Sequence, residues 1–194
     1  MREDDKATER TDDGDVVDLL LRRHALIRDL FDEVERAGAE ERPGAFRRLV
    51  RLLAVHETVE EEIVHPYARH AIDGGDEVVD DRLAEENEAK QLLMDLDKHG
   101  PGAPDFLERL ALLRGAVTAH ARSEERYEFT QLRARTTPAQ RRALAAGLKA
   151  AEAVAPTHPH PGVESATENL LLGPPVALMD RVRDAIRRTT AERN

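Results

Sequence analysis

Apolar residues recur every three to four positions along four long stretches of the chain, a spacing that places them on one face of an α-helix. Each stretch predicts an amphipathic helix of roughly 20–30 residues, or about 30–45 Å. Turn-forming residues interrupt the pattern at 38–44, 73–76, 99–104 and 136–138. Because short connections make consecutive helices antiparallel neighbours, the pattern predicts an all-α, up-down-up-down four-helix bundle.

Each predicted face is apolar at both ends and polar in the middle. The polar positions should therefore meet near one level inside the bundle, while the tyrosines that continue two of the faces should be core residues. The four faces are Val17, Leu20, His24, Ile27, Phe31 and Val34; Leu49, Leu53, His56, Glu60, Ile63 and Tyr67; Val79, Leu83, Glu86, Lys90 and Leu93; and Phe106, Leu110, Leu113, Val117, His120, Glu124 and Tyr127.

The sequence outside these faces divides the chain into three regions. Residues 1–14 are highly charged and are expected to form a disordered acidic tail. Residues 15–136 contain the predicted bundle. Residues 137–194 are expected to form a helical extension. It comprises a fifth helix over 138–153 capped by Thr137, a Pro-rich linker over 157–162 and a last amphipathic helix over 174–188.

Composition narrows the chemistry that the bundle can carry. Aromatic residues make up only 3% of the 194 residues, so the core must be aliphatic. The formal net charge of -10 disfavours binding to nucleic acids, whose phosphates require a basic surface. Since the sequence has no cysteine, disulfides and thiolate-held metals are excluded. A metal would have to be held by imidazole and carboxylate, which suit iron, manganese or zinc.

The sequence shows neither a signal peptide nor an apolar run of about 18 residues that could span a membrane. We therefore expect a cytoplasmic protein without a membrane partner. We also expect it to be either a monomer or a homodimer.

Two His-x-x-x-Glu pairs occupy the polar positions: His56 with Glu60, and His120 with Glu124. Residues four apart share a helix face, with Cβ atoms about 5–6 Å apart, so each pair directs an imidazole and a carboxylate at one place. His24 adds a third imidazole. An unpaired carboxylate costs several kcal/mol to bury, and a bound cation would remove that cost. The arrangement predicts a metal pair with Glu60 and Glu124 as bridging carboxylates.

The order of these residues resembles the hemerythrin-like, or HHE cation-binding, family. His24, His56, Glu60, His120 and Glu124 match the family pattern one for one, within residues 15–135. The region after Pro138 is similar to the C-terminal extension of bacterial members. The resemblance implies a non-haem di-iron site, bridged by carboxylate and oxo groups, that binds O2, NO or peroxide or senses iron. Zinc and manganese also suit these ligands.

The third predicted helix departs from the family pattern, because it contains no histidine where the family normally has one or two. Asn87 occupies that position by alignment, whereas the helical phase directs Glu86 inward. We expect Glu86 to complete the site. Asn87 and Glu57, which is next to His56, are the alternatives.

The other histidines are not expected to be ligands. His65 would lie roughly opposite His56 on a regular helix, so that Glu62-x-x-His65 faces away from the site. His70 lies several turns further along the same helix. The rest are in predicted loops: His99, His158 and His160.

Three functions fit this pattern. Since the site has few imidazoles and many carboxylates, which stabilise ferric iron, redox or stress-related chemistry or sensing is favoured over O2 transport. Weak peroxide decomposition is the candidate enzymatic activity, and a non-catalytic metal-binding protein is the default. The alternative is a metal-binding or metal-sensing interaction module without catalysis. A third reading is an interaction bundle whose site has decayed.

Overall fold

A computed structural model describes residues 14–152, and all regular structure in that part of the chain is helical. Two of the helical segments, η1 and η2, are π-helices. In chain order the elements are α1 (Val16–Arg36), α2 (Arg42–Val59), η1 (Glu60–Val64), α3 (His65–Ala71), α4 (Gly75–His99), α5 (Phe106–Ser123), η2 (Glu124–Glu128), α6 (Phe129–Arg135) and α7 (Pro138–Glu152).

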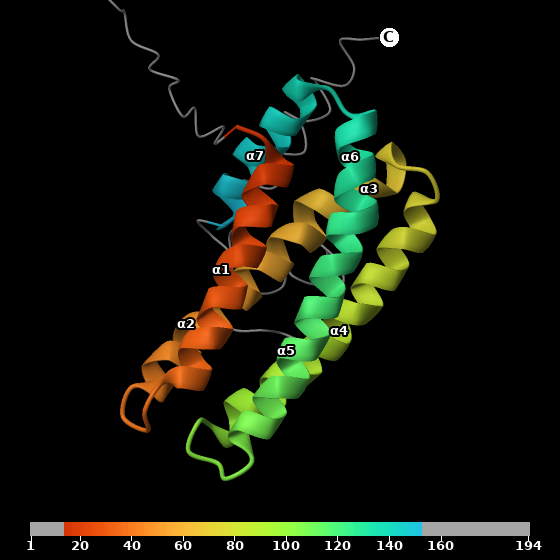
Figure 1. Cartoon of the computed structure of the whole chain (residues 1–194). Coiled ribbons are helices and arrows are strands. Elements are labelled where there is room, and N and C mark those ends of the chain that lie inside the picture. The colour runs from red at the N-terminus through yellow and green to blue at the C-terminus, as the bar shows by residue number, and fades with distance from the viewer. Residues whose placement is uncertain (1–13, 153–194) are drawn as a thin grey trace, which may run out of the picture.

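The elements form four long rods and one shorter helix. The segments α2, η1 and α3 follow one another without interruption, as do α5, η2 and α6. Together with α1 and α4 these rods lie side by side as a helical bundle (Figure 1). The all-α class is therefore confirmed, and the up-down-up-down order stays a prediction from the short connections. The predicted linker and last helix, and residues 1–13 of the predicted tail, lie outside the described residues.

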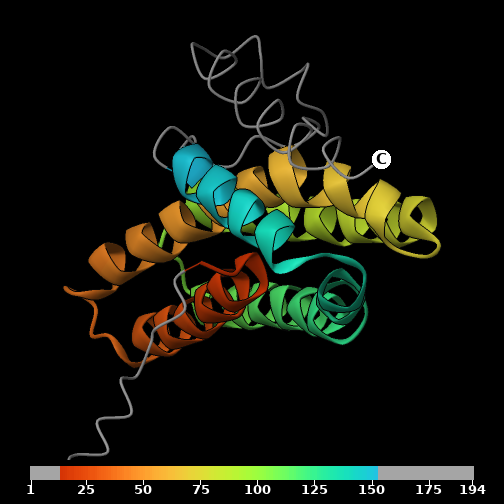
Figure 2. The same ribbon diagram turned by 90° about the horizontal axis from the view of Figure 1, so that it is seen from above.

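Helix α7 packs against the side of the bundle formed by α1 and α2. It contacts α1, α2 and the π-helix η1, and seen from above it lies across the gap between α1 and the α2–α3 rod (Figure 2). Helix α7 is therefore attached to the two rods that carry half of the polar positions.

Local chemistry sets the ends of several helices. The Val17 N–H donates to the Asp15 side chain at 3.0 Å, which caps α1. Gly74 precedes α4 with φ of 64°, a left-handed conformation that glycine adopts without strain. The Gln140 N–H donates to Thr137 Oγ1 at 3.3 Å, and the Thr137 N–H donates to Gln140 Oε1 at 2.9 Å. This capping box confirms the predicted start of α7.

Two apolar clusters fill the bundle, one toward each end. We call the cluster near the α1–α2 and α4–α5 connections the apolar layer. It includes Ile27, Phe31, Val34, Phe46, Leu49, Leu53, Leu93, Leu96, Phe106, Leu110 and Leu113. The other, the α7 cluster, includes Val16, Leu20, Val59, Ile63, Val64, Ala68, Val79, Phe129, Leu132, Leu144 and Leu148. Every rod passes from one cluster to the other through a short buried polar stretch.

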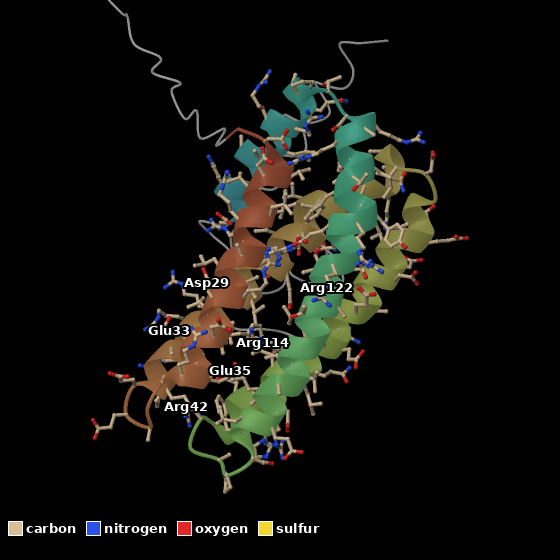
Figure 3. The ribbon with its side chains drawn as sticks, in the orientation of Figure 1. Asp29, Glu33, Glu35, Arg42, Arg114 and Arg122 are labelled. Carbon is tan, nitrogen blue, oxygen red and sulfur yellow. The ribbon has the colours of Figure 1, made fainter. Side chains whose placement is uncertain are left out.

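Ion pairs connect the rods at the surface. Arg114 of α5 reaches Glu35 of α1 at 2.7 Å (Figure 3). It also reaches Asp32 of α1 at 2.7 Å. Such partly exposed pairs contribute little, about 0–1 kcal/mol each, so the apolar clusters supply most of the stability. Among the helices of residues 14–152, none is long and apolar enough to cross a membrane.

Candidate metal centre

The six residues predicted as metal ligands lie together between the two apolar clusters, and none is more than 6% exposed. We call them the polar layer. All four rods contribute to it, because α1, α2, α4 and α5 each supply a side chain and the π-helices each begin with one. The polar layer consists of His24, His56, Glu60, Glu86, His120 and Glu124.

Three groups of buried side chains are each close enough to hold one cation, with ligand atoms that lie within 4.8 Å of one another. Glu60 belongs to the first and second groups, and Glu124 to the first and third. The groups are His24, His56, Glu60 and Glu124; Glu60, Glu86 and His120; and His65, Glu124 and Glu128.

The inner imidazole nitrogens lie at ligand-to-ligand distances from the carboxylates. His24 Nε2 is 3.2 Å and His120 Nε2 is 3.4 Å from Glu124 Oε2, and His56 Nε2 is 3.4 Å from Glu60 Oε2. Two atoms that each bind a metal at about 2.0–2.2 Å are themselves about 3.0–3.5 Å apart at octahedral or tetrahedral angles. These separations exceed those of strong charged hydrogen bonds, about 2.7–2.9 Å. They match ligands arranged around a shared cation.

The outer imidazole nitrogens, in contrast, make ordinary hydrogen bonds. His24 Nδ1 is 2.9 Å from Glu125 Oε1, and His120 Nδ1 is 3.1 Å from Glu85 Oε2. Within residues 14–152, the Nε2 atoms of these two histidines have no hydrogen bond of acceptable geometry. A carboxylate on one ring nitrogen and an unpartnered second nitrogen is the usual setting of a metal-binding histidine.

The two central carboxylates, Glu60 and Glu124, are fully buried. In the described part of the chain, neither oxygen of Glu60 or of Glu124 has a hydrogen-bond partner. Burial, followed by the nearby carboxylates of Glu124 and Glu86, raises the pKa of Glu60 well above its usual value. Carboxylates in this setting are costly unless a cation or a proton neutralises them. The sulfur-free donor set of imidazoles and carboxylates fits iron, manganese or zinc.

Glu86 is the residue that the structure places in the layer, as the helical phase of the sequence predicted. Asn87 is only half-buried and belongs to none of the three groups. Glu57 is buried beside the layer but is also outside the groups. Burial raises the pKa of Glu57 to about 8, although Lys90 opposes the shift. Lys90 itself forms a buried ion pair with Glu61.

The prediction that His65 faces away from the site is wrong. His65 is 2% exposed, with Nε2 2.6 Å from Glu86 Oε1 and Nδ1 3.4 Å from Glu128 Oε1. The cause is the π-helix η1, in which the His65 N–H bonds to the Glu60 carbonyl five residues back. The extra residue in this turn shifts the following side chains around the helix. His65, rather than Val64, therefore returns to the polar side next to Glu60.

The same shift in η2 makes the core prediction for Tyr127 wrong. The Phe129 N–H bonds to the Glu124 carbonyl, again five residues back. Tyr127 is consequently 63% exposed, whereas Glu128 is fully buried. The sequence held a weak signal for this shift, because Phe129 and Leu132 continue the apolar pattern out of phase with Tyr127. Periodicity before Glu124 could not reveal it.

A small cavity borders the polar layer between α1, α2, α4 and α5. His24, His56, Glu57, Glu86 and His120 contribute to its wall, together with apolar residues such as Val117. It offers about 20 Å³ to the centre of a water-sized molecule, which is enough for one such molecule. The cavity therefore has room for one molecule of about the size of water beside the polar layer.

Comparisons with known proteins give the fold and the family of the chain. The model of the hemerythrin HHE cation binding domain matches residues 15–132. In fold the chain is similar to a hemerythrin HHE cation binding domain-containing protein from Mycobacterium kansasii, with a TM-score of 0.64 and 22% identity, over 72% of this chain and 85% of that chain. The chain is also 28% identical to a protein named DNA nickase from Nostoc sp. The match covers 141 residues, which are 72% of this chain but only 40% of that relative. The chain belongs to the hemerythrin HHE cation binding domain family.

Proposed function

We propose that the polar layer holds a di-iron centre. His24 and His56 would face one iron, Glu86 and His120 the other, and Glu60 and Glu124 would lie between them. The observation that carries the proposal is the overlap of two ligand groups at Glu60, combined with four carboxylate oxygens that are buried without hydrogen-bond partners. Two cations would neutralise both carboxylates at once.

The two iron positions differ in charge, which favours redox chemistry or sensing over O2 transport. One position has two imidazoles, whereas the other has one imidazole and the extra carboxylate of Glu86. An additional negative ligand stabilises the more highly charged ferric ion by Coulomb attraction. Iron bound here would supply the binding of O2, NO or peroxide and the associated change of oxidation state.

The surrounding residues would orient the ligands and limit access. Glu125 and Glu85 hold the outer nitrogens of His24 and His120, which fixes the planes of both rings. Phe129 stacks on His24 with ring centroids 5.5 Å apart and shields that ring on the side of the α7 cluster. The cavity beside the layer admits one small molecule, so a bulky substrate is disfavoured.

Optical titration tests this function. Protein loaded anaerobically with iron and then oxidised should show visible absorption that changes when peroxide or NO is added, in proportion to the iron bound. The variant His56→Ala should lose this response, and His70→Ala, an exposed histidine on the same rod, should retain it. An iron-loaded protein that responds to neither peroxide nor NO would sink the proposal of small-molecule chemistry.

The alternative is a metal-sensing module without catalysis, and the packing of α7 favours it. Arg23, the neighbour of His24, makes a bidentate ion pair with Glu152 of α7, with both contacts at 2.7 Å. Helix α7 also contacts η1. Metal occupancy could thus change how α7 is held. Limited proteolysis with and without iron checks this, and identical digestion patterns would rule out the sensing function.

Nucleic acid is not proposed as a partner, because a net charge of -10 opposes binding to phosphates. A monomeric or homodimeric state and a cytoplasmic location stay predictions.

A further inference from the structure

A third ligand group adjoins the proposed iron pair on the side of the α7 cluster. It consists of His65, Glu124 and Glu128, all buried. We propose that these three residues bind a further divalent cation. This third position rests on the proposed di-iron centre as its neighbour, because the two share Glu124.

His65 has the arrangement of a metal-binding histidine. In the tautomer with its proton on Nε2, His65 donates to Glu86 Oε1 at 2.6 Å and its Nδ1 lone pair faces Glu128 Oε1, 3.4 Å away. His24 and His120 likewise have one nitrogen bonded to a carboxylate and the other facing the layer. A carboxylate that accepts from the outer nitrogen fixes the tautomer and makes the inner nitrogen a better ligand.

The distance between His65 and Glu128 is that of neighbouring ligands. At 3.4 Å it is long for a hydrogen bond between nitrogen and oxygen. It equals the separation of His56 Nε2 and Glu60 Oε2 in the first group. Atoms about 2.0–2.2 Å from one cation would be separated by this amount.

Glu128 is the residue that the iron pair leaves unexplained. It is fully buried, and within residues 14–152 its Oε2 atom has no hydrogen-bond partner. It belongs to neither group of the proposed pair, so two irons would not neutralise it directly. A buried carboxylate needs a charged or hydrogen-bonding partner. The Oε1 atom of Glu128 has the 3.4 Å contact with His65 Nδ1, and a cation shared with His65 and Glu124 would neutralise the carboxylate.

Both π-helices are needed to assemble this group. The π-helix η1 begins at Glu60 and returns His65 to the polar side, and η2 begins at Glu124 and buries Glu128. A π-helix is less stable than the α-helix it interrupts and is found frequently at functional sites. Two such distortions at the same level, each delivering one potential ligand, indicate that the third group is functional.

Cobalt titration tests the third position. Metal-free full-length protein is titrated with Co2+ under anaerobic conditions, and the metal retained after gel filtration is counted while visible absorption follows its coordination. We expect three Co2+ per chain in the unaltered protein and two in each of His65→Gln and Glu128→Gln. The controls His70→Gln and Glu88→Gln replace exposed residues of the same types and should keep three.

Each other result overturns the third position, in a distinguishable way. Two Co2+ in the unaltered protein and in both variants would leave the proposed pair standing and remove the third cation. If His65→Gln loses one metal of the proposed pair and Glu128→Gln loses none, the role of His65 is only to orient Glu86. Fewer than one Co2+ in the unaltered protein would defeat the proposed function as well. Thermal melts of the metal-free variants establish whether they fold. We expect Glu128→Gln to fold, because it preserves the shape of the side chain and removes only its charge.

Discussion

The apolar layer and the polar layer are built by the same four rods but obey different physical rules. In the apolar layer the helices are regular, and side chains such as Phe46 and Phe106 pack edge to face with centroids 5.1 Å apart. The apolar layer is stabilised by the burial of its side chains and requires no bound ion. In the polar layer, the carboxylates of Glu60 and Glu124 are buried and have no hydrogen-bond partner within residues 14–152. The comparison leads to the prediction that a bound cation stabilises the polar layer and has no direct effect on the apolar layer.

Adding or removing metal should therefore produce the largest effect. If iron binds the folded state and not the unfolded state, each site stabilises the protein by about 4 kcal/mol when the free metal concentration is 1,000 times the dissociation constant. Chelation should return the protein to the lower stability of the unneutralised polar layer. Urea unfolding with and without iron measures the difference. Equal midpoints in both conditions would show that the polar layer needs no cation.

Truncation in the apolar layer should be nearly as costly but independent of metal. Phe106→Ala should lower the free energy of unfolding by about 3–5 kcal/mol, because it removes a fully buried ring and leaves a cavity. Iron content per folded chain should stay unchanged. Leu107→Ala is the matched control, since Leu107 is 44% exposed on the same turn. Loss of iron in folded Phe106→Ala would mean that the two layers are coupled.

The metal-free protein should lose stability as the pH rises from about 7 to 9. Burial raises the pKa of Glu57 from 4.5 to about 8, so the folded state holds a proton that the unfolded state has released. For His120, burial opposes protonation, but the Glu124 carboxylate and the hydrogen bond to Glu85 raise the pKa from 6.5 to about 9. Both groups bind more protons in the folded state. Each lowers stability by up to about 1.4 kcal/mol per pH unit, Glu57 up to about pH 8 and His120 up to about pH 9.

Iron should abolish or reverse this pH dependence, because metal binding requires the unprotonated form of its ligands. His56 does not alter the sign, because its pKa is lowered to about 3 by burial and by the neighbouring His24, and its effect lies below pH 6.5. Urea unfolding at pH 7, 8 and 9 checks both states. Rising stability of the metal-free protein over this range would contradict the predicted protonation.

The smallest effect on stability should come from replacing Tyr127, which lies in the π-helix η2, where the helical phase shifts. Tyr127→Ala should change the free energy of unfolding by no more than about 0.5 kcal/mol, as expected for an exposed residue. Phe129→Ala, two residues further on and buried, should cost about 3–5 kcal/mol. Similar costs for both variants would indicate a regular helix through η2.

The contrast between the layers also explains how much could be predicted from the sequence. The faces of α1 and α4 and the first parts of the other rods follow the regular helical period, so their buried residues could be identified, including all six of the polar layer. Glu86 could be chosen over Asn87 by phase alone. His65 and Glu128 could not be found, because His65 directly follows the π-helix η1 and Glu128 is the last residue of η2, and each π-helix adds one residue to its turn. Local sequence does not reveal such a change when packing and site chemistry impose it.

Iron analysis of full-length protein purified from iron-supplemented medium is the most direct test of the metal centre. If the polar layer is a metal centre, elemental analysis should find at least two irons per chain, and His56→Ala/His120→Ala should retain fewer than one. Phe106→Ala, which alters only the apolar layer, should bind as much iron as the unaltered protein. Fewer than one iron per chain in the unaltered protein would contradict the proposal and leave an interaction bundle with a decayed site.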